Sequence, residues 1–356
     1  MNKILMLDNG QPFNFETPYE SPLGGSETSF LLLSKGLAEL NNSVVILSSS
    51  TVNVPQQDYN RLLHNINNIG GILPESDIII CNRCLPMEVL QSDKRIFYYS
   101  HDAFDQTHIL QWMIEPIIVN RIEKILCVSE WQKNTFKKYY NIPEKKLFVL
   151  GNSIDSSLYW GFKQRNLNKL IFASIPYKGI DVLHEIFSDI CIKSERDNLE
   201  LHIYSSMELY GDTSGDEEYA DSFSKLSRTN GIILHKPTSM ANLAAELLSS
   251  NLYIHPCTYH ESFGMLTVQS QAAGCLPVTI DNGANIELVD NNKTGFITKG
   301  KTIYHNDCYN EYINKIVDLL TLTKKEDELY KLRLEAQKSA SKYNYIEIAK
   351  KLINLF

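Results

Sequence analysis

The sequence predicts an α/β protein made of two Rossmann-like domains, each with a doubly wound parallel sheet. Short apolar runs alternate with amphipathic helical stretches along the whole chain, and this alternation is typical of parallel strands joined by helical crossovers. The 356 residues exceed the roughly 250–300 residues at which a single hydrophobic core stops growing, which favours two domains. Glycines and capping residues stand between several runs and helices, as strand-to-helix turns require.

The expected elements fall into two sets. Strands of the first domain are expected at residues 3–7, 44–47, 77–81, 95–99, 124–128 and 147–150, and those of the second at 169–174, 199–204, 232–235, 252–255 and 276–280. Helices are expected after Ser26, which would be an N-cap, and at residues 109–122, 131–140, 238–248, 265–273, 306–320 and 324–356. The segment Gly151-Asn-Ser-Ile-Asp155 marks a junction, so we place the domains at residues 1–160 and 161–340.

The composition excludes several classes of protein. A formal net charge of −8 and an isoelectric point of 5.6 argue against general nucleic-acid binding, which needs a basic surface. The sequence has no run of about 18 apolar residues that would predict a membrane-spanning helix, and Asp8 follows the start too closely for a secretory signal. We therefore expect a cytoplasmic protein with its seven cysteines reduced. Cys81 and Cys84 have the spacing of half a metal site, but two buried thiols are the simpler interpretation.

The most informative stretch is residues 252–280, which predicts a strand, a polar loop, a helix ended by Gly274 and another strand. The loop lies at the carboxyl end of a strand, the edge at which open α/β sheets bind ligands. Gly264 permits close approach of the backbone, and the amide groups of Gly264, Met265 and Leu266 lie at the positive end of the helix, a natural phosphate site. The carboxylate of Glu261 would repel a phosphate, so it is better suited to accept hydrogen bonds from sugar hydroxyls.

The same stretch resembles a known family. Glu261-Ser-Phe-Gly-Met-Leu-Thr-Val-Gln269 and, two residues on, Ala-Ala-Gly-Cys-Leu-Pro-Val resemble the hallmark segment of retaining glycosyltransferases of family 4. These enzymes have the GT-B fold, in which two Rossmann-like domains face each other across a cleft. In that fold the last helix, residues 341–356 here, crosses back to the first domain. The family usually has a second Glu that holds the ribose hydroxyls; Gln269 replaces it and lacks the charge.

Two segments of the first domain also resemble the family's site. Gly24-Gly25 before an amphipathic helix resembles the loop that approaches the donor phosphates and the acceptor. His101 follows a predicted strand, and the resemblance implies that it faces the donor sugar and acceptor. It would bind a sugar hydroxyl or assist proton movement, with Asp102 or Asp105 to orient it.

In the second domain, Lys178 stands beside Gly179 in a strand-to-helix turn. A lysine there is a point charge for phosphate, and it matches the family's lysine that binds the donor diphosphate. The arginine usually found about five residues earlier is missing, because Ala173 and Ser174 occupy that region. Lys178 would then neutralise the diphosphate largely alone.

The resemblance implies the remaining contacts and the chemistry. Loops after the strands at 199–204 and 232–235 should border the nucleobase and ribose. The donor-binding candidates are Gly24, Gly25, Lys178, Ser205, His235, Lys236, Glu261, Phe263, Gly264, Met265, Leu266 and Gln269, and the catalytic candidates are His101, Lys178 and Glu261. The family implies a front-face transfer of a hexose from a UDP- or GDP-sugar. The departing phosphate oxygen takes the acceptor proton, so neither a protein base, a metal nor a cofactor is expected.

The expected acceptor is a glycan, a glycolipid or a lipid-linked molecule in cell-surface polysaccharide synthesis. Lysines gather on and after the predicted helix at 131–140: Lys133, Lys137, Lys138, Lys145 and Lys146. Most such runs are solvated faces of a helix. The functional interpretation is peripheral docking of the protein to the anionic inner face of a membrane.

Three alternatives remain open at this point. A GT-B protein that binds a nucleotide or glycan without turnover is favoured by Gln269 and by the missing arginine. An epimerase or a phosphorylase on the same fold is the second, although a phosphorylase needs a pyridoxal-phosphate lysine in a much longer chain. An NAD-linked oxidoreductase is disfavoured because G-x-G-x-x-G is absent.

Overall fold

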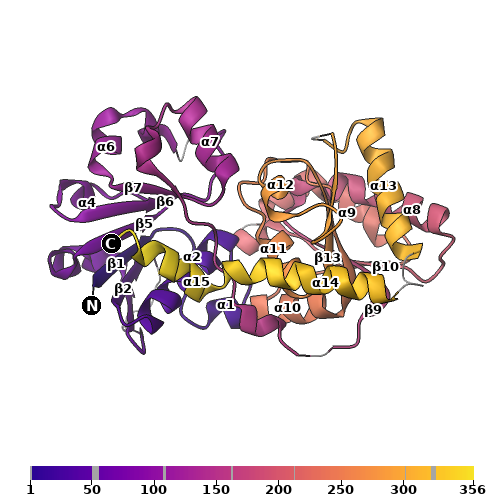
Figure 1. Ribbon diagram of the computed structural model, residues 1–356, viewed down its shortest axis with the longest axis horizontal. Helices are drawn as coiled ribbons and strands as arrows, with labels where there is room; N and C mark the ends of the chain where they lie inside the picture. Colours follow the sequence, from indigo (N-terminus) through magenta and orange to yellow (C-terminus); the bar gives the residue numbers. More distant parts are fainter. Residues whose placement is uncertain are drawn as a thin grey trace. The chain divides into compact units, whose positions relative to one another are not determined.

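The computed structural model describes residues 2–49, 56–106, 110–161, 163–211, 213–300, 302–321 and 326–356. The chain divides into two compact units. The first comprises Met1–Pro18, Leu23–Asp155 and Tyr343–Phe356, and the second comprises Tyr19–Pro22 and Ser156–Lys342. Each unit is an α/β structure in which helices cover a central sheet (Figure 1).

The sheet of the first unit has the strand order β3-β4-β2-β1-β5-β6-β7-β8. Its strands are β1 (Lys3–Asp8), β2 (Ser43–Ser48), β3 (Gln56–Asp58), β4 (Arg61–Asn65), β5 (Ile78–Asn82), β6 (Arg95–Tyr99), β7 (Lys124–Cys127) and β8 (Leu147–Val149). Its described helices are α2 (Gly25–Glu39), preceded by α1 (Thr17–Glu20), then α3 (Ile69–Ile72), α4 (Met87–Gln91), α6 (Pro116–Arg121), α7 (Glu130–Tyr139) and α15 (Tyr345–Ile353). Only the edge pair β3 and β4 is antiparallel. The direction of winding reverses between β1 and β5, and such a reversal makes a ligand crevice at the carboxyl ends of the strands.

The sheet of the second unit is parallel throughout, in the order β11-β10-β9-β12-β13-β14. Its strands are β9 (Asn166–Ala173), β10 (Glu200–Tyr204), β11 (Ile232–His235), β12 (Ser250–His255), β13 (Leu276–Ile280) and β14 (Phe296–Thr298). Its described helices are α8 (Leu183–Ser194), α9 (Ala220–Ser227), α10 (Met240–Ser249), α11 (Met265–Ala272), α12 (Asn285–Leu288), α13 (Asn306–Thr321) and α14 (Glu326–Ala340). Counted along the chain, this is the Rossmann order, with its switch point between β9 and β12.

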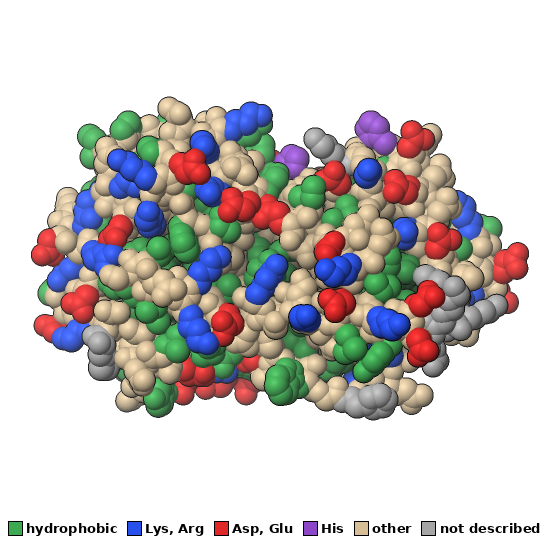
Figure 2. All heavy atoms as spheres, viewed as in Figure 1, with side chains coloured by type: hydrophobic (Ala, Val, Ile, Leu, Met, Phe, Trp, Pro, Cys, Tyr) green, Lys and Arg blue, Asp and Glu red, His purple; other side chains and the backbone are tan. Residues whose placement is uncertain are grey.

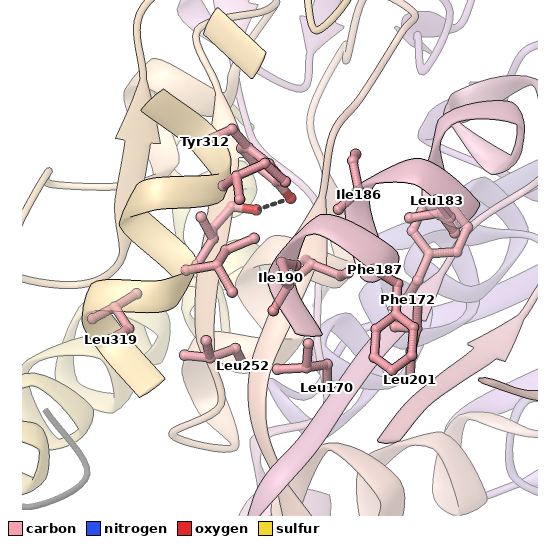
Figure 3. Packing of buried hydrophobic residues seen from close by; sticks show 14 of the residues in the cluster. Leu170, Phe172, Leu183, Ile186, Phe187, Ile190, Leu201, Leu252, Tyr312 and Leu319 are labelled. Atoms are coloured by element: carbon pink, nitrogen blue, oxygen red, sulfur yellow. Dashed lines mark hydrogen bonds between the residues drawn. The ribbon is translucent and has the colours of Figure 1, made fainter. Parts of the chain in front are cut away.

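Helix α8 shows how the sequence pattern builds the core of the second unit. Leu183, Ile186, Phe187 and Ile190 recur at helical spacing and are buried. Figure 3 shows them beside apolar side chains of the sheet, such as Phe172. The fully buried hydroxyl of Tyr312 donates a hydrogen bond to the carbonyl oxygen of Val278 at 3.0 Å, which satisfies its polar group.

The expected strands and the α/β class are confirmed, but one expected helix is wrong. Residues 109–122 were expected to form a single helix; among the described residues, a 3₁₀ turn at Gln111–Ile114 is followed by α6. Glu115 between them has φ −94° and ψ 103°, outside the helical region. The reason is Pro116, because the ring of a proline disfavours the helical conformation in the residue before it.

Two further helix boundaries differ from expectation. The stretch expected as one helix at 324–356 holds α14 and α15, and Asn344 caps α15 by accepting a hydrogen bond from the amide of Ile346 at 2.9 Å. Helix α2 begins at Gly25 with Gly24 as its N-cap, so Ser26 is not the cap; its hydroxyl instead donates to Glu27 at 2.8 Å.

The last helix packs within the first unit. Helix α15 lies against α2 (Figure 1). A Cβ atom at Gly36 of α2 would stand 2.6 Å from the carbonyl oxygen of Tyr345, so the two backbones approach as closely as glycine allows. In the same unit Cys81 and Cys84 are buried free thiols, as the simpler interpretation predicts.

Candidate functional site

Two charged side chains meet at the switch point of the second unit. Lys178 ends a 3₁₀ turn, Pro176–Lys178, that follows β9, and Glu261 lies in the loop after β12. The ammonium Nζ of Lys178 is 2.5 Å from Oε1 of Glu261. Gly179, next along the chain, has φ 121°, a conformation that glycine adopts without strain. The order of the strands thus brings together two residues that are far apart in the sequence.

This ion pair is largely buried, with 21% of the Lys178 side chain and 7% of the Glu261 side chain exposed. Burial acts to raise the pKa of Glu261, but the Lys178 ammonium and then His255 outweigh it and lower the pKa to about 2. Burial acts to lower the pKa of Lys178, and the Glu261 carboxylate outweighs it, so this pKa is raised. Both groups are therefore charged at neutral pH.

Hydrogen bonds from the turn after β13 fix the backbone of the loop that carries Glu261. The side-chain amide of Asn282 donates to the carbonyl oxygen of Tyr259 at 3.1 Å, and the backbone amide of Ala284 donates to the carbonyl oxygen of Glu261 at 2.7 Å. Gly283 has φ 64°, and a Cβ atom there would stand only 2.2 Å from that same Glu261 oxygen. The backbone of Glu261 is therefore fixed by a contact that only glycine permits.

Helix α11 begins beside this carboxylate. Its N-cap is Gly264, in the left-handed conformation with φ 99°. The amides of the first helical turn, which include Met265 and Leu266, have no partner within the helix, and that end carries the positive pole of the helix dipole. The side chain of Phe263 is buried, with 3% of its surface exposed, so a ligand would contact the backbone at this position.

The other expected donor contacts are spread along the same edge of the sheet. Ser205 follows β10, and its buried hydroxyl has no hydrogen-bond partner among the described residues. His235 ends β11, where its ring stacks on that of Tyr204 at 4.4 Å, and Lys236 after it is exposed. Gln269 is buried on α11. In the described part of the chain, no hydrogen bond or ion pair joins these side chains to Lys178 or Glu261.

The carboxyl edge of the sheet in the first unit carries charges that were not expected from the sequence. Arg83 follows β5 and binds the carboxylate of Asp102 through Nε at 3.1 Å and Nη2 at 2.8 Å. Its Nη1 is 3.9 Å from Oε1 of Glu27, in the first turn of α2. Asp102 was one of two residues expected to orient His101, but its carboxylate is held by Arg83 instead. Its position could have identified Arg83 from the sequence, because it directly follows a buried strand at the edge of the sheet where ligands bind.

His101 follows β6 and lies with its ring 4.2 Å from the ring of Tyr99. Burial and then the charge of Arg83 lower the pKa of His101 to about 3. The imidazole is therefore neutral at pH 7, and it is suited to hydrogen bonding rather than to holding a proton. Gly24 and Gly25 form the start of α2, so the expected phosphate-approaching loop is a helix N-terminus.

One cluster in the second unit has the donor atoms of a metal site. His255, Cys257 and Glu261 offer a nitrogen, a sulfur and an oxygen that all lie within 4.8 Å of one another. The ammonium of Lys178 already contacts Glu261 at 2.5 Å, and it would repel a cation there. The arrangement is therefore poorly suited to hold a metal ion.

The basic cluster on α7 is partly neutralised. Lys137 is paired with Glu144 at 2.6 Å, and Lys133 lies 3.4 Å from Glu130 and 3.7 Å from Glu144. Figure 2 shows Lys and Arg side chains interspersed with Asp and Glu over the face in view. Within the described residues, every helix is too short or too polar to cross a lipid bilayer.

Two family descriptions match this chain. Residues 23–158 match Glycosyltransferase Family 4, and residues 168–331 match Glycosyl transferases group 1. Together the two matches cover most of the chain, one in each unit. No curated protein sequence matches it.

Solved structures show the same fold. A glycosyltransferase from Rickettsia africae has 17% identity and a TM-score of 0.71, covering 100% of this chain and 98% of its own. Anabaena HepE in complex with UDP-glucose has 16% identity and a TM-score of 0.72, with 100% and 99% covered. WaaG, a glycosyltransferase of lipopolysaccharide biosynthesis, has 12% identity and a TM-score of 0.66, with 99% of each chain covered.

Proposed function

Because this chain belongs to the glycosyltransferases of group 1 and family 4, with the GT-B fold, we propose that it is a retaining hexosyltransferase whose donor is a nucleotide-diphosphate sugar. The observation that carries this proposal is the Lys178–Glu261 ion pair beside the N-terminus of α11. A cation and helix amides bind a diphosphate, and a carboxylate binds sugar hydroxyls, so this one edge offers partners for both parts of the donor.

The proposed reaction needs negative charge to be neutralised at the leaving group. As the bond between the sugar C1 and the diphosphate oxygen breaks, Lys178 and the first amides of α11 stabilise the charge that develops on that oxygen. Glu261 holds the hexose hydroxyls and orients the ring. The acceptor hydroxyl forms the new bond to C1 on the same face, and its proton passes to the departing phosphate oxygen. His101, being neutral, positions a hydroxyl group.

This proposal requires no metal ion and no further cofactor. The positive charge that a divalent cation supplies to a diphosphate in other enzymes comes here from the Lys178 ammonium and from the helix dipole of α11. The remaining expected contacts, Ser205, His235, Lys236 and Gln269, would border the nucleoside. The complex of Anabaena HepE with UDP-glucose supports a UDP-sugar as the first donor to test.

A panel of UDP-, GDP- and ADP-sugars tests the function directly. A true donor at about 100 times its Kd should stabilise the folded chain by about 2.7 kcal/mol in a thermal-shift measurement. The stabilising sugar nucleotide should then be consumed when an acceptor glycan or glycolipid is added. Stabilisation without transfer or donor hydrolysis would favour the alternative of a GT-B protein that only binds its nucleotide or glycan.

Gln269→Glu is expected to tighten donor binding by about fivefold. A hydrogen bond to a charged carboxylate is worth roughly 1 kcal/mol more than one to a neutral amide, and the ribose hydroxyls would donate it. Titration calorimetry with the sugar nucleotide found in the panel measures the change. The same variant without donor should be less stable, because Gln269 is buried and burial disfavours a charged carboxylate. Unchanged or weaker donor binding would remove the ribose contact from the proposal.

We also propose that the chain works at the cytoplasmic face of a membrane, in cell-surface polysaccharide synthesis, with a glycan or lipid-linked acceptor. The relation of WaaG to lipopolysaccharide biosynthesis supports this acceptor class.

Exchanging Lys133, Lys137 and Lys138 for Glu should abolish salt-sensitive binding to anionic vesicles, at about 1 kcal/mol per lysine. Glu144→Gln should strengthen binding, because Glu144 neutralises two of these lysines. Co-sedimentation with anionic vesicles measures the binding of both variants. Binding that neither the lysine exchange nor Glu144→Gln alters would refute docking through α7.

A further inference from the structure

A pocket lies at the carboxyl end of α11, away from the Lys178–Glu261 pair. A cavity of about 600 Å³ opens where the start of β9, the carboxyl end of α11 and the helix α14 come together. Figure 1 shows α14 running beside α11, and the two helices are in contact. Sites for small organic ligands occupy about 300–1,000 Å³, so the volume suits a ligand the size of a sugar phosphate or a nucleotide. We call this cavity the α11 pocket.

Two partly buried arginines form one wall of the α11 pocket. Arg165 donates to the carbonyl oxygens of Leu247 and Ala273, the latter at 2.7 Å, and to that of Ser250. Arg333 donates to the carbonyl oxygen of Gly274 at 2.5 Å and to the backbone and side-chain oxygens of Asn251. Every acceptor is a neutral oxygen. Toward the described residues, each guanidinium uses three of its five N–H groups, so two remain on each arginine.

The charged side chains that line the α11 pocket carry a net positive charge. Lys163, whose ammonium also donates to the carbonyl oxygen of Ala245 at 2.8 Å, adds a third cation, and the lining has a single carboxylate, the exposed Asp327. The carboxyl ends of α10 and α11, which the arginines cap, contribute about −0.5 charge each. About one positive charge is left over. Burial lowers the pKa of Arg333 to about 10, and the charge of the nearby Arg165 adds to this effect.

Side chains beside Arg333 on the same face of α14 add apolar surface to the pocket. Tyr330 and Leu334 of α14 lie on the lining with 62% and 45% of their surface exposed. A phenol ring beside cationic groups offers a surface on which a flat or apolar organic group packs while its charge meets the arginines. From this combination we propose that the α11 pocket binds a phosphate ester, its phosphate on Arg165, Arg333 and Lys163 and its organic part against Tyr330 and Leu334.

Titration calorimetry on the full chain tests this with three probes: inorganic phosphate, glucose 6-phosphate and phenyl phosphate. We expect the two esters to bind more tightly than inorganic phosphate. Lys163→Glu, a change at an exposed position, should weaken all three probes by about tenfold, a loss of about 1.4 kcal/mol. Tyr330→Ala should weaken phenyl phosphate but leave inorganic phosphate unchanged. Lys225→Glu on α9 is the matched control and should change nothing.

The outcomes separate this pocket from the transfer site. Lys178→Met should leave probe binding unchanged, whereas loss of binding in that variant would place the phosphate at the donor site. Absence of saturable binding at millimolar concentration, or binding that both Lys163→Glu and Tyr330→Ala leave intact, would overturn the proposal. A chain that lacks transferase activity but binds the probes in this pattern would contradict the proposed function and support the α11 pocket.

Discussion

Replacing Lys178 by Met is expected to lower kcat by about 10²–10³-fold, the usual effect of removing one preorganised contact to charge that develops in the transition state. Methionine keeps the length and apolar stem of the side chain and removes the ammonium. In the absence of that charge the departing diphosphate has only the amides of α11 to stabilise it. Initial rates with saturating sugar nucleotide measure the change, and near-native turnover would refute the role of Lys178.

The same variant should also reverse a pH dependence of stability. In the native chain the pKa of Glu261 is lowered to about 2, so the pair adds stability above the ordinary carboxyl pKa of about 4.3, and this is lost as pH falls through 2. In Lys178→Met burial acts with less opposition and the pKa of Glu261 rises. The folded chain then binds the proton more tightly than the unfolded chain, and stability falls as pH rises from 5 to 8. Thermal melts across that range check the sign.

Lys169→Met is the matched control for this experiment. Lys169 is a buried lysine of the same unit, paired with Glu246, and it belongs to β9, away from its carboxyl end. Breaking either pair leaves a carboxylate without its cation, which costs roughly 3–5 kcal/mol when the pair is buried. Both variants should therefore lose stability, but only Lys178→Met should lose kcat. Equal losses of kcat in both would show that unfolding, and not leaving-group chemistry, explains the effect.

Gly283→Ala is expected to abolish transfer and to destabilise the chain by about 2–5 kcal/mol, from backbone strain together with overpacking. The added Cβ would stand 2.2 Å from the carbonyl oxygen and 2.6 Å from the amide nitrogen of Glu261. Neither atom belongs to a flexible side chain, so the Glu261 loop has to move. The carboxylate would leave Lys178, and the donor would lose its sugar contact. Donor titration and a thermal melt measure both parts.

Gly151→Ala controls for the backbone strain alone. Gly151 has φ 91°, but a Cβ atom there meets nothing closer than 3.5 Å. It should lose about 1–3 kcal/mol of stability from the left-handed backbone and keep its donor affinity. If Gly283→Ala also kept its donor affinity, the position of Glu261 would not depend on the turn after β13.

The sequence predicts the edge of the sheet where the site lies, because Lys178 and Glu261 each follow a buried strand. It does not predict that their side chains touch. That contact depends on β9 and β12 being neighbours, and strand order comes from long-range packing that hydrophobic periodicity does not report. The resemblance pointed to both residues, but not to the ion pair between them.

Other parts of the site were missed for local reasons. His255 ends an apolar run, and its sequence context is that of a core residue, although its Nε2 lies 3.5 Å from Glu261. Gly283 follows the predicted strand at residues 276–280 closely, but the Glu261 oxygen that it makes room for lies in another loop. Arg83 lies between Cys81 and Cys84, and the spacing of these cysteines led to an interpretation based on the thiols and not on the arginine. In each case the partner that gives the residue its role is remote in sequence.

Helix α11 is short, and the proposed donor site and the α11 pocket lie at its opposite ends. Eight residues at about 1.5 Å each span roughly 12 Å. Two anions bound at that separation repel each other by about 0.3–1.4 kcal/mol, depending on how well water screens them. A sugar nucleotide bound at one end of the helix should therefore raise the Kd of a phosphate ester at the other end by up to about tenfold, and the reverse should hold. Added salt should weaken this effect, because it screens the repulsion between the two anions.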